Sequence, residues 1–394
     1  MGNPGLVAAA RRAHAVWTLL VLVATSLAYA VPYEVVDTGG FFSSSSPYNS
    51  SLAEVGGLAA VVYRANGECR YAVRDGSPWG TPTATGARRP HSPLTEWQGQ
   101  PAFVDGPTMY NAGDPEHLEF WVGTDTGWAS TPINDSDGKH PSNFLCLDGK
   151  LHLGLTSKGG GKIYFSTLQD DGSWDHTLVF DGRDWMCGGG LCLADIGGHA
   201  AMAYRGGWTE TGGPDWPIRL YYAENDGTDW VISPELDQIG INARPVSLTS
   251  FHGDPVIVYG NDGTDTVDMQ IRRDGTWEKY VLRNALSCLS VSATECSGVL
   301  AVSYIGRAPG HPWGVHLGLY DGASWSWKMM DTIGQLDWNQ TSVAEIDGRL
   351  GLAYESHSTN GELRYMSLNV PEPATMGLFG ISLTLLLSRR RRRT

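Results

Sequence analysis

A unit of about 48 residues recurs along almost the whole chain, and this repeat constrains the fold more than any other feature. Its clearest copy spans residues 245–282, PVSLTSFHGDPVIVYGNDGTDTVDMQIRRDGTWEKYVL. Four short segments in this copy alternate in hydrophobicity or are β-branched, and turn residues separate them. The pattern predicts four antiparallel strands rather than a helix.

Two landmarks set the register of the copies. One is an apolar strand that usually ends in Tyr, found at Tyr63, Leu155, Tyr204, Tyr259, Tyr304 and Tyr354. The other is a Trp after a Gly-containing turn, found at Trp79, Trp128, Trp174, Trp230, Trp277 and Trp325, with intervals of 49, 46, 56, 47 and 48 residues. Four strands per unit of this length are typical of β-propeller blades, because a single blade cannot bury both faces of its sheet.

A seventh, incomplete copy settles the number of blades. It stops at Asn369 without its Trp-bearing strand, whereas residues 33–40 (YEVVDTGG) match residues 327–334 (WKMMDTIG), which aligns Asp37 with Asp331. We therefore expect an all-β fold over residues 31–369, a seven-bladed β-propeller of four-stranded antiparallel blades. The N-terminal strand would complete the last blade and close the ring. The alternative is a sandwich of Gly-rich strands, although a sandwich needs no fixed Trp interval.

Residues 1–30 are typical of a secretory signal peptide. Its parts are the basic Arg11 and Arg12, the apolar run 16–27, and the A-x-A cleavage motif at Ala28 and Ala30. Signal peptidase is expected to cut there, which would leave the closing strand at the new N-terminus. The alternative is a retained membrane anchor.

The other end, residues 370–394, has three parts in sequence. They are the tripeptide Pro371, Glu372 and Pro373, the apolar run 374–387, and the basic cluster Arg389, Arg390, Arg391, Arg392 and Arg393. The apolar run has 14 residues, which is short against the roughly 20 of a full membrane span, and the arginines would hold its end on the cytoplasmic side.

This tail resembles the PEP-CTERM sorting signal of Gram-negative bacteria, in which a short transmembrane helix separates the tripeptide from the arginines. The resemblance implies a membrane-anchored precursor that an exosortase, a membrane-embedded cysteine transpeptidase, processes near the tripeptide. It also implies delivery to the cell surface or extracellular matrix. An ordinary C-terminal anchor is the alternative.

Charge excludes one class of partner. All 42 acidic residues lie between residues 31 and 373, whereas 7 of the 28 basic residues lie in the two terminal segments, so the mature formal charge falls from −14 to −21. Binding to nucleic acid or to an anionic membrane requires a basic face, and this composition opposes it. The charge suits an exported protein, including one that uses divalent cations.

Export permits disulfides among the six cysteines. Cys187 and Cys192 flank a glycine run, and Cys288 and Cys296 bracket one strand with its turn, so both pairs are candidates for local bridges. Cys69 and Cys146 would remain as a third pair. No His lies at metal-site spacing from a Cys pair, so we expect no zinc site.

The irregular loops are where a propeller carries its ligands. Arg, His and Trp gather in the second-to-third-strand loops and in the connections between blades, at Arg88, Arg89, His91, Trp185, Arg205, Trp208, Trp216, His311, Trp313 and Trp338. Such side chains could stack on and hydrogen-bond a sugar or a peptide. The competing interpretation is that the rings only pack the loops onto the blades.

The alternative to a binding module is a sialidase-like glycoside hydrolase. Tyr63-Arg64, Tyr204-Arg205 and Tyr354-Glu355 could supply its Arg and Tyr/Glu groups, but no Arg-Ile-Pro motif is present. Residues 225–230 (NDGTDW) are similar to the Asp-box of sialidase-like propellers, which is itself structural.

Calcium is a weaker possibility. Residues 135–138 (DSDG) resemble half of a calcium loop without its closing Glu, and residues 261–265 (NDGTD) form an acidic turn. The repeats themselves resemble a widespread class of bacterial secreted proteins with no common reaction, so they indicate fold rather than function. We expect a non-catalytic binding or structural module, with no catalytic residues, resident metal or other cofactor.

Overall fold

The computed structural model describes residues 32–38, 50–76, 78–88, 90, 92–106, 117–136, 139–157, 161–181, 190–207, 218–234, 236–239, 246–261, 263–307, 310–334, 340–356 and 361–370. The chain divides into two units, Met1–Pro32 and Tyr33–Thr394, and the second contains every described strand. The expected signal peptide and sorting tail lie outside the described residues. Within those residues, no helix is long and apolar enough to cross a membrane.

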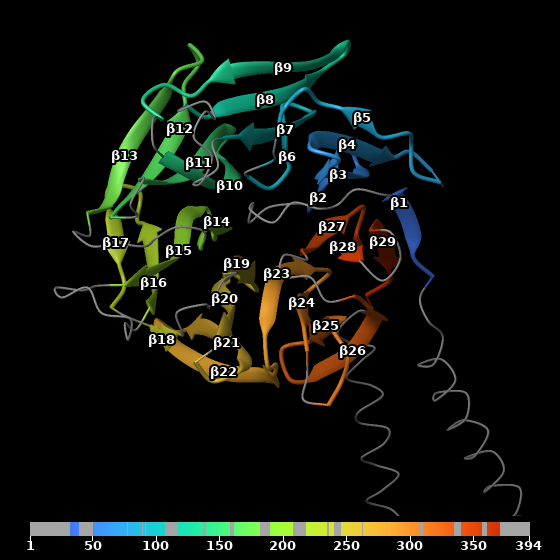
Figure 1. The fold of residues 1–394 in the computed structure, drawn as a ribbon. Coiled ribbons are helices and arrows are strands. Elements are labelled where there is room, and N and C mark those ends of the chain that lie inside the picture. The colour runs from blue at the N-terminus through green and yellow to red at the C-terminus, as the bar shows by residue number, and fades with distance from the viewer. Residues whose placement is uncertain are drawn as a thin grey trace, which may run out of the picture. The chain divides into compact units, whose positions relative to one another are not determined.

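The second unit folds into seven antiparallel sheets, which we number as blades in chain order (Figure 1). Blade 1 contains β2 (Ser50–Val55), β3 (Leu58–Ala65), β4 (Glu68–Arg74) and β5 (Thr83–Ala84), and blade 2 contains β6 (Thr95–Trp97), β7 (Gln100–Asp105), β8 (Glu119–Thr124) and β9 (Gly127–Pro132). Blade 3 contains β10 (Lys139–Leu147), β11 (Lys150–Ser157), β12 (Lys162–Leu168) and β13 (Trp174–Asp181). Blade 4 contains β14 (Leu191–Ile196), β15 (His199–Gly207) and β16 (Ile218–Asn225), with an outer strand in two pieces, β17 (Trp230–Ile232) and β18 (Asp237–Ile239).

The remaining blades follow the same order. Blade 5 contains β19 (Val246–Phe251), β20 (Asp254–Asn261), β21 (Thr266–Arg273) and β22 (Thr276–Asn284), and blade 6 contains β23 (Cys288–Cys296), β24 (Val299–Gly306), β25 (Gly314–Tyr320) and β26 (Trp325–Thr332). Blade 7 contains β27 (Thr341–Ile346), β28 (Arg349–Ser356), β29 (Glu362–Leu368) and, as its outer strand, β1 (Glu34–Thr38). The first strands of successive blades pack against one another in a closed cycle, because β27 also contacts β2. The expected seven-bladed propeller is confirmed.

The N-terminal strand closes the ring as expected. Figure 1 shows β1, in blue, beside β29, in red, and the two strands pair antiparallel with Asp37 opposite Leu363. Val36 is an extra, bulged residue just before Asp37, and Met330 is bulged in the same way just before Asp331 in β26. The alignment of the two Asp residues therefore holds in three dimensions, including an irregularity that the sequence pattern did not reveal.

Each first strand joins its second strand through a turn of two residues with positive φ. The second turn residue is always glycine, with φ between 68° and 89°, as a type I′ turn requires. The seven turns are Gly56-Gly57, Gln98-Gly99, Asp148-Gly149, Gly197-Gly198, His252-Gly253, Ser297-Gly298 and Asp347-Gly348. We call the strand ends that carry these turns the turn edge. The opposite ends, from which the second-to-third-strand connections and the links to the next blade leave, form the loop edge.

The repeated tryptophans join neighbouring blades. Five of them make edge-to-face contacts with an aromatic ring on the third strand of the preceding blade, at centroid distances of 5.0–5.7 Å. The pairs are Trp79–Tyr365, Trp128–Tyr71, Trp174–Phe120, Trp230–Phe165 and Trp277–Tyr222. Each such pair contributes about 0.5–1.5 kcal/mol beyond the burial of its area, so the fixed Trp interval reflects blade stacking.

The predicted disulfides are wrong where the structure describes both partners. Cys288 and Cys296 are the first and last residues of β23 and both are free. An extended strand of that length spans about 26 Å, whereas a disulfide needs Cα atoms within about 7 Å. Cys69 is buried in blade 1 and Cys146 is exposed in blade 3, and these two are also free.

Cys192 is free as well, and its predicted partner Cys187 lies outside the described residues. Its thiol donates a hydrogen bond to the backbone oxygen of Val246 in blade 5. In β14 it holds the second position, which Ser247 holds in β19, where the serine hydroxyl accepts a bond from the backbone N of Ala293 in blade 6 (3.0 Å). Cys192 thus serves as one of the side chains that join adjacent first strands.

Candidate functional site

The side chains proposed for ligand binding divide between described and undescribed segments. Arg88 is exposed after β5, and its backbone N donates to Asp105 Oδ2 in blade 2 (2.9 Å). Arg205 is half-buried in β15, and a Cβ on Gly190 would meet its side chain at 2.4 Å, so the two are tightly packed. His311 is exposed and Trp313 half-buried just before β25.

These four residues belong to blades 1, 4 and 6, so they come from separate parts of the ring. The other six predicted binding residues lie outside the described residues, namely Arg89, His91, Trp185, Trp208, Trp216 and Trp338. Their role stays a prediction. The sorting and cleavage residues also lie outside the described residues.

Two of the second-strand tyrosines, Tyr63 and Tyr354, connect neighbouring blades through their hydroxyls in the same way. Tyr63 and Tyr354 are fully buried, and their hydroxyls donate to Asp37 Oδ2 (2.8 Å) and Asp331 Oδ2 (2.9 Å), each on the outer strand of the preceding blade. Burial, reinforced by the neighbouring carboxylate, raises the pKa of both tyrosines far above the usual range. Neither hydroxyl is available as a nucleophile at neutral pH.

An arginine on the third strand completes each of these contacts. Arg70 lies opposite Tyr63 in the strand register and reaches Asp37 at 3.1 Å, and Arg364 lies opposite Tyr354 and pairs with Asp331. We call this arrangement of Asp, Tyr and Arg across two blades an Asp-Tyr-Arg tie. Arg70 also lies 3.9 Å from Glu68 and Arg364 lies 2.7 Å from Glu362, so in each tie a guanidinium pairs with the carboxylate that accepts from the tyrosine.

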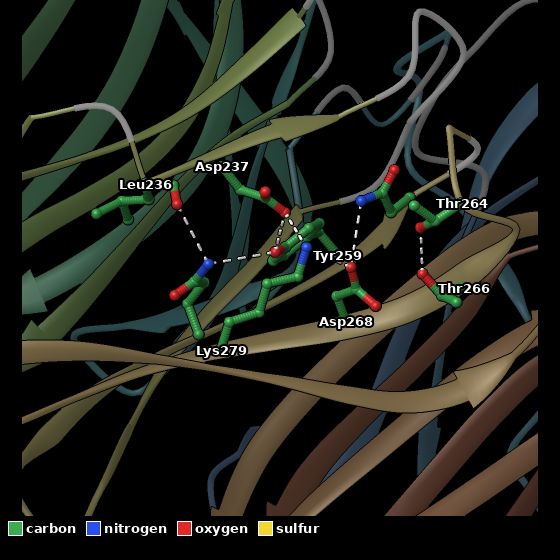
Figure 2. Close-up of polar contacts among 9 residues, drawn as sticks. Leu236, Asp237, Tyr259, Thr264, Thr266, Asp268 and Lys279 are labelled. Atoms are coloured by element: carbon green, nitrogen blue, oxygen red, sulfur yellow. Dashed lines mark hydrogen bonds and ion pairs between the residues drawn. The ribbon is translucent and has the colours of Figure 1, made fainter.

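Blade 5 has the same tyrosine and a different charge pattern (Figure 2). Tyr259 donates to Asp237 Oδ2 of blade 4 at 2.6 Å, as in the ties, but the residue opposite Tyr259 is Asp268 rather than an arginine. The cation comes from the fourth strand instead, where Lys279 Nζ lies 2.7 Å from Asp237 and 3.1 Å from Asp268. Asp268 is fully buried, so the polar group is enclosed between two blades.

The blade 5 polar cluster extends toward the loop edge. Asn261 Nδ2 donates to Asp268 Oδ2 (3.2 Å), and the hydroxyls of Thr264 and Thr266 share a hydrogen bond of 2.6 Å. Gln270 lies on the other side of Asp268 and approaches the Tyr259 hydroxyl at 3.5 Å. Sequence reasoning missed this cluster. A signal was present, because Asp268 and Gln270 alternate with apolar residues on a strand that the propeller covers on both faces.

Glu355 is the carboxyl group that the sialidase-like interpretation would pair with Tyr354, and it is buried. It follows Tyr354 in β28, and burial raises its pKa to about 8, which contacts with the Ser50 side chain and the Gln340 backbone offset only in part. Because it is 1% exposed, it lies within the packing between blades 7 and 1.

The Asp residues of the Gly-containing turns before the fourth strands are structural. Asp226 Oδ1 accepts bonds from the backbone N atoms of Thr228 and Asp229, both at 2.9 Å, and these bonds lower its pKa to about 2. Asp321 holds its turn in the same way. No group of three or more His, Cys, Asp and Glu that could hold a metal ion occurs in the described part of the chain.

Comparison with known proteins identifies one segment of the sequence. Residues 369–393 match the PEP-CTERM protein-sorting motif. No curated protein matches the chain.

Solved structures support the fold. An ulvan lyase of polysaccharide lyase family PL25, bound to a GlcA–Rha3S oligosaccharide, has 9% identity and a TM-score of 0.58, over 86% of this chain and 96% of that one. A mutant of AofleA from Arthrobotrys oligospora has 13% identity and a TM-score of 0.50, over 78% and 90%. A mutant of the NanB sialidase from Streptococcus pneumoniae has 14% identity and a TM-score of 0.44, over 86% and 70%. At such identities the first two show the fold alone, and the third carries no argument. The chain is thus a seven-bladed β-propeller whose C-terminus carries a PEP-CTERM sorting motif.

Proposed function

We propose that the mature chain is an exported propeller, displayed at the cell surface or in the extracellular matrix, that binds a glycan or a protein without catalysis. The observation that carries the proposal is where the sorting motif begins. The last strand, β29, ends at Leu368, and the motif starts at residue 369. Processing near Pro371 would therefore remove the tail without removing any part of a blade. A signal-peptidase cut after Ala30 would likewise spare β1, which starts at Glu34.

The commitment of the second-strand tyrosines to packing supports the non-catalytic part of the proposal. A sialidase-like reaction needs a Tyr nucleophile activated by a Glu and accessible to substrate. Here Tyr63 and Tyr354 donate to carboxylates between blades, and Glu355 is enclosed beside Tyr354. These residues are explained by blade packing.

The longest connections lie at the loop edge rather than at the turn edge, and this supports the loop edge as the binding face. At the turn edge every first-to-second-strand connection has two residues and the longest third-to-fourth-strand connection has 8, whereas at the loop edge β7 and β8 are separated by 13 residues and β15 and β16 by 10. Long connections on a rigid scaffold are where binding residues concentrate. The exposed Arg88 and His311 lie in loop-edge connections, between β5 and β6 and between β24 and β25.

The export part is tested by intact mass and cell fractionation of the native chain beside a variant with Pro371, Glu372 and Pro373 replaced by alanine. We expect the native chain to lose its tail and leave the membrane, and the variant to stay full-length and embedded. A matched control replaces three exposed prolines of the propeller by alanine, Pro132, Pro234 and Pro312, and should be processed normally. Identical retention of the tail in all three proteins would overturn the sorting proposal.

The binding part is tested on the released protein with an array of extracellular glycans and a fluorogenic sialoside. We expect saturable binding to a subset of glycans, weakened in the Arg88→Ala and His311→Ala variants, and no release of the fluorophore. Turnover of the sialoside by the native protein would overturn the non-catalytic assignment and favour the hydrolase.

A further inference from the structure

The blade 5 polar cluster places a fully buried carboxylate where the Asp-Tyr-Arg ties place an arginine. Opposite the second-strand tyrosine, blades 1 and 7 place Arg70 and Arg364, and blade 5 places Asp268. Asp237 and Asp268 then share a single cation, Lys279. The cluster has a net formal charge of −1, with one of its carboxylates fully buried. An unmatched buried charge is costly, so the arrangement favours a further cation.

Two buried oxygen atoms in the cluster lack a hydrogen-bond partner. Asp268 Oδ1 and Asn261 Oδ1 are both buried and make no hydrogen bond, whereas the other carboxylate oxygen of Asp268 accepts from Asn261 Nδ2 and pairs with Lys279. Their residues are 0% and 2% exposed. Figure 2 shows Asp268 beside the labelled Thr264 and Thr266. A buried acceptor without a donor costs about 1–3 kcal/mol, more when it is charged, and a bound cation would offset that cost.

We propose that this cluster binds a hard divalent cation of the calcium class, with Asp268 Oδ1 and Asn261 Oδ1 as ligands. The available donors are a carboxylate, an amide oxygen and two hydroxyls. Calcium accepts such mixed oxygen sets with irregular geometry, whereas magnesium demands an octahedron and zinc and copper favour nitrogen or sulfur. The site uses one carboxylate and neutral oxygens, which is why it does not form a cluster of three acidic or imidazole side chains. All of these ligands belong to blade 5, and Lys279 links Asp268 to Asp237 of blade 4.

Calorimetric titration of the EDTA-stripped full chain with CaCl₂ tests the proposal. We expect one calcium ion per chain, and a Tm that rises with calcium concentration because the ion binds only the folded state. Asp268→Asn keeps the shape and removes the charge, and should weaken binding at least about tenfold. Asn261→Ala should weaken it while leaving Asp268 and Lys279 in place, which guards against a failure of the first variant to fold.

Asp331→Asn is the matched control, because Asp331 meets a tyrosine and a cation between two blades but has an arginine as its partner. It should bind calcium as the native chain does. Absence of calcium binding by the native chain at millimolar CaCl₂ would overturn the proposal and leave a bridging water as the partner of the two oxygens. Binding that survives both Asp268→Asn and Asn261→Ala would overturn it too.

Discussion

The joint between blades 7 and 1 and the joint between blades 6 and 7 use the same tie under different constraints. At the second, Asp331 belongs to β26, which a hairpin connects to the rest of its blade. At the first, Asp37 belongs to β1, which is held to β29 only by non-covalent contacts. The tie between blades 6 and 7 thus only helps to align two blades. The tie between blades 7 and 1 also helps to hold β1 in place.

The closing joint carries additional polar contacts. Arg74 of blade 1 makes a bidentate pair with Glu34 of β1, at 2.8 Å to each carboxylate oxygen, and Trp79 packs edge-to-face on Tyr365. Val36 of β1 is buried in the core between blades 7 and 1. The comparison teaches that closure of this ring relies on many side chains of a five-residue strand rather than on its short ladder alone.

The largest expected effect concerns Glu355, which is buried at the closing joint. Its pKa is raised to about 8 in the folded chain, so the folded state holds the proton more tightly than the unfolded state, and its stabilising contribution is complete below about pH 4.5. Stability should then fall by up to about 1.4 kcal/mol per pH unit until about pH 8. Glu355→Gln should remove this dependence.

Denaturant unfolding of native and Glu355→Gln proteins between pH 5 and 8 measures the difference. As pH rises, the free energy of unfolding of the Glu355→Gln variant should increase relative to that of the native protein. Glu68→Gln, a change at an exposed carboxylate with 59% side-chain exposure, provides the control and should track the native protein. If the free energy of unfolding varied with pH in the same way for all three proteins, the prediction for Glu355 would be wrong.

The second prediction compares Asp37→Ala with Asp331→Ala. Removal of Asp37 takes the carboxylate away from the buried Tyr63 hydroxyl, leaves Arg70 only its long contact of 3.9 Å with Glu68 and frees the outer strand, so we expect a loss of about 2–4 kcal/mol. Asp331→Ala should cost less, because Arg364 keeps Glu362 as a partner at 2.7 Å. Urea unfolding gives both values, and limited proteolysis should cut the Asp37 variant first near its N-terminus. An equal loss in the two variants would remove the distinction between the joints.

The smallest effect is expected for Arg74→Lys. An ammonium group cannot reproduce the bidentate geometry to Glu34, but both side chains are about a third exposed, so the loss should be about 0.5–1 kcal/mol. Arg273→Lys in blade 5 should cost less, because its contact with Glu278 is longer at 3.7 Å and its hydrogen bond to the Tyr320 hydroxyl is 3.3 Å. The two midpoints in urea are the measurement, and a larger loss in the Arg273 variant would contradict the ranking.

Much of the fold could be predicted because it depends on period and turn chemistry. The Trp interval is fixed by contacts between successive blades, as for Trp174 on Phe120, and closure followed from the likeness of Asp37 and Asp331. Sequence spacing alone suggested a disulfide between Cys288 and Cys296, and this was wrong. An extended strand places residues that are close in sequence far apart in space.

The candidate sites were harder to predict for a different reason. Asp268 lies in a strand whose polar and apolar residues alternate as in a strand with one face in solvent. Its polar face is enclosed only because blade 4 covers it. Which third-strand residues meet a neighbouring carboxylate is therefore decided by the ring and not by the strand. The predicted binding residues are on connections whose sequence has no period, so composition could indicate a face but no arrangement.

The pairing of β1 with β29 has a consequence for the covalent chain itself. Glu34, at the start of β1, lies opposite Tyr365, three residues before β29 ends. Blade 7 is therefore a normal blade in which the third-to-fourth-strand hairpin has been cut. A short linker across this gap would turn the backbone into a circle, and the opening could then be moved to any other hairpin. A circular permutant that starts at β2 and keeps β29 joined to β1 should form the same ring, with closure no longer dependent on a free end.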